Sequence, residues 1–95
     1  MIIRQQGEVF PCIEGVAITG YFARVNSTQR KFENFDEALV FTRQELSQQV
    51  ASDINAAGAY EAVVELDETE VWSGMVKLSA WAIGKPGLDG NGRYE

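Results

Sequence analysis

The sequence contains no histidine and only one cysteine among its 95 residues. Histidine is the side chain that most often serves as acid, base or metal ligand near neutral pH, so its absence excludes histidine-based triads and zinc sites. The lone Cys12 cannot form an intramolecular disulfide, and no imidazole is present to activate its thiol. We therefore expect no enzymatic activity, no cofactor and no metal. A mechanism built on carboxylates or lysine is the remaining catalytic alternative.

Long apolar runs are also missing, and their absence is evidence on the cellular compartment of the protein. The longest uninterrupted apolar stretches are only a few residues, far below the roughly 20 that a membrane-spanning helix needs. Residues 1–6 turn polar too early for the apolar part of a secretory signal. Small secreted domains also usually contain several cysteines. These features predict a cytoplasmic protein with no membrane partner, and they place the start of the fold at the N-terminus.

Basic residues are outnumbered, since 8 Lys and Arg stand against 14 Asp and Glu and give a formal net charge of −6. The basic residues are dispersed, and Arg30 and Lys31 are the only adjacent pair. Because a negative field opposes approach to phosphate backbones, we expect no direct nucleic-acid binding. The same field favours a partner with a basic surface.

Proline is scarce and the glycines are scattered, so neither an internal linker nor a repeat is visible. A chain of 95 residues, 45% of them hydrophobic, is long enough for one core and too short for two. Residues 84–92 have the composition of a mobile tail. We predict a single domain over residues 1–84 and a flexible C-terminal tail over residues 85–95.

The N-terminal part of the chain predicts a β-hairpin. Residues 16–25 are rich in β-branched and aromatic side chains and form the second strand, with a bulge expected at Gly20. Residues 8–13 form the first strand, and Glu14 and Gly15 follow as the turn. Because proline cannot donate a hydrogen bond to a sheet ladder, Pro11 places this first strand at a sheet edge.

A helix is predicted from residue 34 to Gly58. Asn34 or Asp36 can cap its first turn, and Asn34 with Glu37 three residues later resembles a capping box. Gly58 is suited to a left-handed C-terminal cap. Phe41 lies off the apolar stripe, so it either packs under a neighbouring loop or contacts a partner. The apolar stripe consists of Leu39, Leu46, Val50, Ile54 and Ala57.

The remaining segments complete an α+β fold. A short return strand is predicted at residues 30–33, and strands at residues 60–66 and 71–83 are joined by residues 67–70 into an antiparallel hairpin. The expected architecture is an antiparallel sheet of four to five strands with one helix packed on one face, in the order β-β-(β)-α-β-β. The opposite face of the sheet has no helix to cover it.

Alternation divides the final hairpin between the two faces of the sheet. The set expected to face the helix is Tyr60, Ala62, Val64, Leu66, Trp72, Val76, Leu78, Ala80 and Ala82. On the uncovered face we expect an apolar patch ringed by acids, formed by Val63, Val71, Met75 and Trp81 and extended by Tyr21. Two readings compete with this patch: Trp81 can be ordinary core, and a bulge at Gly74 would move the later residues to the other face.

Five acids, Glu61, Glu65, Asp67, Glu68 and Glu70, fall within ten residues that contain no Lys or Arg. One interpretation is a solvated hairpin tip whose charges discourage edge-to-edge aggregation. The other is a negative surface that steers the domain onto a basic partner.

These features predict a non-enzymatic protein-binding domain. One version is a small acidic inhibitor of a basic nucleic-acid-handling protein, of the immunity or phage anti-defence type encoded by phages or mobile elements. The alternatives are a small-molecule-binding homo-oligomeric domain and an accessory enzyme that uses carboxylates such as Glu61 and Glu65. A homodimer through the uncovered sheet face is compatible with the first two. The predicted partner-binding residues are Glu61, Val63, Glu65, Asp67, Glu68, Glu70, Val71, Met75, Trp81, Phe41 and Tyr21.

Overall fold

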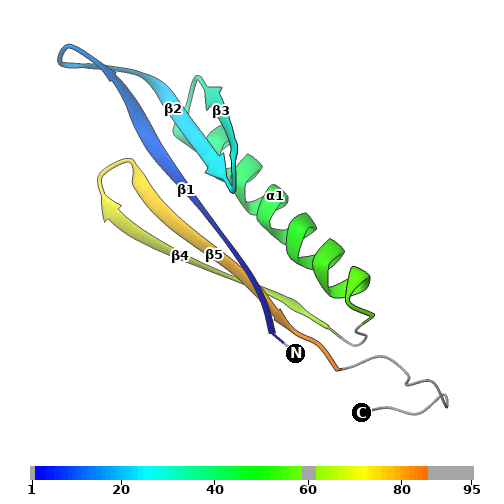
Figure 1. Cartoon of the computed structure of the whole chain (residues 1–95). Helices are drawn as coiled ribbons and strands as arrows, with labels where there is room; N and C mark the ends of the chain where they lie inside the picture. Colours follow the sequence, from blue (N-terminus) through cyan, green and yellow to red (C-terminus); the bar gives the residue numbers. More distant parts are fainter. Residues whose placement is uncertain (1, 59–61, 86–95) are drawn as a thin grey trace, which may run out of the picture.

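The computed structural model describes residues 2–58 and 62–85. Its elements are β1 (Ile2–Glu14), β2 (Ala17–Val25), β3 (Thr28–Phe32), α1 (Phe35–Ala56), β4 (Val64–Trp72) and β5 (Met75–Ile83). The strands form an antiparallel sheet in the order β3-β2-β1-β5-β4, and α1 lies along one face of it (Figure 1). The predicted α+β architecture and element order are confirmed. Tyr60, Glu61 and residues 86–95 of the predicted tail lie outside the described residues.

The first strand is central in the sheet from Ile2 to Val9, so its predicted edge position holds only for the part beyond Val9, which contains Pro11. β1 pairs with β2 on one side, and from Ile2 to Val9 it also pairs with β5, which comes from the other end of the chain. Pro11 lies beyond Val9, where β1 no longer has a partner in β5. The missing N–H of proline is therefore tolerated by a strand that is central along one part and an edge along another.

The bulge in the first hairpin lies beside its predicted position. Cys12 pairs with Gly20 and Ile13 pairs with Ile18, which leaves Thr19 as the extra residue of β2. The Thr19 hydroxyl donates a hydrogen bond to the Cys12 carbonyl over 3.4 Å.

Local signals set both ends of α1 as predicted. The backbone of Asn34 is extended, and its side-chain oxygen accepts a hydrogen bond from the Glu37 N–H over 2.8 Å. Asp36 and Glu37 place negative charge in the first turn, at the positive end of the helix dipole. Gly58 follows the helix with a φ of 77°, the left-handed conformation that suits glycine.

The buried stripe of α1 differs in part from the predicted one. Its members follow at every fourth residue: Ala38, Thr42, Leu46, Val50 and Ile54. Leu39 is only partly buried, and Ala57, the residue after the helix, is exposed. Small side chains at Ala38 and Thr42 let the first half of the helix approach the sheet closely. A Cβ atom added at Gly7 of β1 would lie only 3.1 Å from Thr42 Cγ2.

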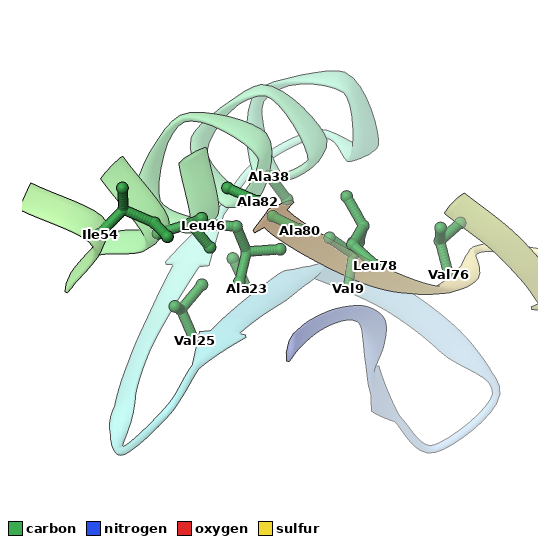
Figure 2. Close-up of a cluster of buried hydrophobic side chains, with 11 residues drawn as sticks. Val9, Ala23, Val25, Ala38, Leu46, Ile54, Val76, Leu78, Ala80 and Ala82 are labelled. Carbon is green, nitrogen blue, oxygen red and sulfur yellow. The ribbon is translucent and has the colours of Figure 1, made fainter. Parts of the chain in front are cut away.

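Side chains from the sheet complete the core under α1. Figure 2 shows Leu46 and Ile54 of the helix above side chains of β1, β2 and β5. As predicted, the β5 side chains at every second position from Val76 to Ala82 are buried, and Val64 and Leu66 of β4 pack against them. The predicted burial of Trp72 is wrong, since 73% of this residue is exposed.

The second hairpin turns later than predicted. Residues 67–70 are not a connection: β4 continues to Trp72, and the turn follows at Ser73 and Gly74, where Gly74 has a φ of 80°. Acidic residues are weak strand formers, but an edge strand tolerates them, and pairing with β5 decides their conformation. Glu70 pairs with Val76 and Trp72 with Met75, so a bulge puts Trp72 on the same side as Met75.

Candidate functional site

The face of the sheet that points away from α1 is called here the open face. Within residues 2–58 and 62–85, no helix covers it. Cross-strand register arranges its side chains in rows that cross β1, β5 and β4. The side chains on the open face include Arg4, Gln6, Glu8, Phe10, Phe22, Arg24, Glu65, Asp67, Thr69, Lys77, Ser79 and Trp81.

The first row brings an arginine and a tryptophan together. Arg4 of β1 is opposite Trp81 of β5, which in turn is opposite Glu65 of β4. The Arg4 guanidinium carbon lies 5.8 Å from the centre of the Trp81 ring, which is cation–π geometry. Trp81 is half-buried on the open face, as one of the two sequence interpretations predicted, and it is not part of the core under α1.

The middle rows are polar and form a shallow depression of about 470 Å³. Arg24 is fixed in it by three hydrogen bonds: Nη1 donates to Glu8 over 2.9 Å, and Nε and Nη2 both donate to Gln29 over 3.2 Å. The lining residues are Gln6, Gly7, Glu8, Arg24, Asn26, Asp67, Thr69, Lys77, Leu78 and Ser79. The depression thus combines carboxylate, guanidinium, ammonium and hydroxyl groups.

An aromatic pair adjoins the depression. Phe10 of β1 and Phe22 of β2 are cross-strand partners whose ring centres are 5.5 Å apart. The Arg24 guanidinium carbon lies 5.0 Å from the centre of the Phe10 ring. Arg24 is therefore held both by its polar partners and by an aromatic face, and this rigidifies an otherwise flexible side chain.

The open face is close to neutral, and this corrects the expected ring of acids. Among the described strand residues, its basic side chains are Arg4, Arg24, Lys31 and Lys77, and its acidic ones are Glu8, Glu14, Glu65 and Asp67. The predicted single apolar patch is also wrong, because Val63 and Trp81 lie at one end of β4 and β5 and Val71 and Met75 at the other. The six residue-to-residue steps from Met75 to Trp81 span roughly 20 Å at the usual rise of a strand.

The acidic run is divided between the two faces of the sheet. Alternation puts Glu65 and Asp67 on the open face, and Glu68 and Glu70 on the helix side. Both carboxylate oxygens of Glu68 accept hydrogen bonds from Arg43 of α1, one from Nε and one from Nη2, the latter over 2.9 Å. These bonds lower the pKa of Glu68 below its ordinary value of 4.5. Glu68 therefore joins β4 to the helix.

The two aromatic residues predicted as contacts lie on the helix side of the sheet. Phe41 packs on Phe32 of β3 with ring centres 5.1 Å apart, so it covers an edge strand and not a loop. Arg30 lies over both rings, with centroid distances of 5.2 and 5.4 Å. Tyr21 contacts Phe35 edge-on at 5.5 Å, which corrects its expected position on the open face.

Sequence reasoning missed Arg4, Phe10 and Arg24 as parts of this surface. Residues 2–10 alternate, with Arg4, Gln6, Glu8 and Phe10 against Ile3, Gln5, Gly7 and Val9, and that alternation was the available signal. It becomes meaningful only when β1 is known to be a central strand with two distinct faces.

The described residues contain no group of three or more Cys, Asp or Glu side chains that could hold a metal ion. In the same residues, α1 is too polar to cross a membrane. Comparison with protein-family models, with curated proteins and with solved structures finds no match.

Proposed function

We propose that this chain is a non-enzymatic, cytoplasmic protein-binding domain whose partner docks on the open face. The observation that supports this most is the pair of stacked arginines, Arg4 on Trp81 and Arg24 on Phe10, on a face that the described chain leaves uncovered. Arginine and aromatic residues are enriched at protein interfaces and among the residues that dominate binding energy. Here they are held on paired strands, so little side-chain freedom remains to be lost on binding.

The polar depression between the two stacked pairs suits the same role. Its charged groups offer directional hydrogen bonds, and its mixed charge favours a partner surface that is also mixed. Glu65 and Asp67 lie on the open face of β4, the outermost strand on that side of the sheet. These two acids support the narrower proposal of an inhibitor that occupies a basic, nucleic-acid-handling protein, as phage or mobile-element accessory proteins do.

The test is affinity capture from a lysate of the source cells, followed by calorimetry with the purified partner. We expect Arg4→Ala and Trp81→Ala each to weaken binding at least about tenfold, the effect of losing roughly 1.4 kcal/mol at a dominant interface residue. Gln48→Ala, on the exposed side of α1, is the matched control and should bind like the wild type. Wild-type affinity in folded Arg4 and Trp81 variants would refute the docking face.

The inhibitor version has a separate readout. Charge reversal at Glu65 and Asp67 should weaken the complex and reduce its dependence on salt. If the salt dependence is unchanged, the acids of β4 do not contact the partner, and the narrower proposal fails while the docking face stands.

The depression also supports a second candidate function, binding of a small polar molecule. Its volume of about 470 Å³ falls within the usual range of ligand pockets, and Glu8, Arg24 and Lys77 converge on it. A ligand that binds only the folded state raises the melting temperature. A thermal-shift screen of metabolites and nucleotides should then find a stabiliser whose effect is lost in Lys77→Ala. A screen without such a compound would exclude this candidate.

A further inference from the structure

The first hairpin continues past the rest of the fold as a ribbon, residues 10–22, which is two-stranded from Cys12 to Gly20 because Tyr21 and Phe22 still pair with β3. β5 stops pairing with β1 at Val9, and Figure 1 shows the ribbon extending beyond the N-terminal end of α1. Near the tip, Ile13 and Ile18 are cross-strand partners with 60% and 54% of their surface exposed, and Val16 in the turn is fully exposed. An isolated two-stranded hairpin is marginally stable in water, so an exposed apolar ribbon favours a covering partner.

Four apolar side chains of the ribbon form a strip on its helix side, whereas Phe10 and Phe22 lie on the open face. Tyr21 faces α1, its partner Pro11 shares that side, and alternation puts Ile13 and Ile18 there as well. At its base the strip runs into a cavity of about 500 Å³ beside the start of α1. That cavity is lined by Tyr21, Phe35, Leu39, Glu68, Glu70, Ser73, Gly74 and Val76. The helix layer thus ends where the strip begins.

We propose that a second copy of this chain covers the strip, in a two-fold symmetric dimer in which the two ribbons pack face to face. Two sheets pack about 10 Å apart, which is close to the 10–12 Å thickness of a helix. The partner's ribbon therefore fits the layer that α1 leaves vacant beyond Phe35. Two-fold symmetry brings the same strip of the two copies into contact.

The distribution of charge favours a second copy at this place. Each chain has a net charge of −6, which opposes self-association in general, but the ribbon contains a single charged residue, Glu14. Two copies that meet through their ribbons therefore approach where their repulsion is least. A strongly basic partner, by contrast, finds no charges on the strip to pair with.

The ribbon is also protected against edge-to-edge pairing, which leaves its face as the contact. Pro11 removes a donor from the edge of β1 beyond Val9, and the bulge at Thr19 distorts β2. Both are devices by which proteins prevent the addition of strands to an edge. The contact differs from the open-face homodimer expected from the sequence, and it leaves the open face available to a partner.

The test is the mass of the full chain in solution, measured by light scattering over a wide range of concentration. We expect twice the 10.5 kDa chain mass for the wild type and 10.5 kDa for Ile18→Lys under the same conditions. Val40→Lys is the matched control, because Val40 is a β-branched residue on α1 with a similar exposed fraction of 47%, and it should remain dimeric. Arg4→Ala should also remain dimeric, which separates this contact from the proposed docking face.

Cross-linking locates the contact independently of stability. In a Cys12→Ser background, Ile18→Cys should give a covalent dimer with a short bis-maleimide, and Ser79→Cys on the open face should not. A wild-type chain that stays at 10.5 kDa at every concentration overturns the proposal. A folded Ile18→Lys variant that remains dimeric overturns it too, as does cross-linking through position 79 in place of position 18.

Discussion

Replacing Gly7 by alanine tests how closely the helix approaches the sheet. Gly7 lies in β1, between its partners Val25 and Leu78 on the neighbouring strands and directly beneath Thr42 of α1. The added methyl group would lie 2.9 Å from the Arg24 carbonyl oxygen and 3.1 Å from Thr42 Cγ2. The first contact is with backbone that two strand pairings hold in place, so the strain cannot be relieved by turning one side chain.

The expected loss of stability can be worked out from these contacts. Overpacking a well-packed core costs about 1–3 kcal/mol. Alanine restricts the conformations of the unfolded chain more than glycine does, and this stabilises the folded protein by about 0.4–1 kcal/mol. The difference between these ranges is about 0–2.6 kcal/mol. Because the closest contact is with backbone that cannot move aside, we expect Gly7→Ala to lower the free energy of unfolding by about 1–2 kcal/mol, out of the roughly 5–14 kcal/mol typical of a chain of this length.

The assay is urea denaturation followed by far-ultraviolet circular dichroism, with protein concentration held constant because self-association would change the apparent stability. The midpoint should fall while the m-value stays unchanged. Thr42→Ser removes the methyl group that the new alanine meets and keeps the hydroxyl, which donates to the Ala38 carbonyl over 2.8 Å. In that background Gly7→Ala should cost less, by about 0.5 kcal/mol or more. A neutral Gly7→Ala, or an equal cost in both backgrounds, would refute the close approach.

Three further predictions concern α1 and its attachment. Asn34→Ala should cost about 1 kcal/mol, because the Glu37 N–H loses its acceptor, whereas Asn34→Asp should keep the cap; equal losses in denaturation would contradict the capping role. Glu68→Gln should cost up to about 1 kcal/mol at neutral pH. Because the folded-state pKa of Glu68 is lowered from 4.5, this benefit is present above that value and is lost as the pH falls through the folded pKa. The stability curves of wild type and variant should therefore converge as the pH falls below the folded-state pKa of Glu68, and parallel curves would refute the ion pair. Leu46→Ala should cost about 2–5 kcal/mol by calorimetry and Leu39→Ala clearly less, since only Leu46 is fully buried; the reverse order would contradict the observed stripe.

Local chemistry was enough to place the helix. Asn34 accepts a backbone hydrogen bond at one end and Gly58 takes a left-handed conformation at the other, and both preferences act within a few residues of the chain. Period-two alternation in β5 likewise identified the buried side chains from Val76 to Ala82, because the geometry of a strand alone puts every second residue on one face.

The candidate site depended on pairing that local patterns do not contain. Trp81 was assigned to the open face by alternation, but its contact with Arg4 exists only because β1 pairs with β5 across the sheet. The same pairing made β1 a central strand despite Pro11. The division of the acidic run followed from the position of a turn at Ser73 and Gly74, where the strong charge of residues 67–70 had indicated a loop.

The sequence by itself determined where the helix lies, the order of helix and strands along the chain, and which side of β5 is apolar, because propensity, capping and periodicity act over a few residues. Only the tertiary structure decided where the N-terminal end of α1 lies relative to the sheet, and hence that Ile13 and Ile18 stay uncovered. Ile2 and Ile83, nearly a whole chain apart, are paired in the sheet. Contacts of that range depend on the packing of all elements together, and it is these contacts that create both the open face and the free ribbon.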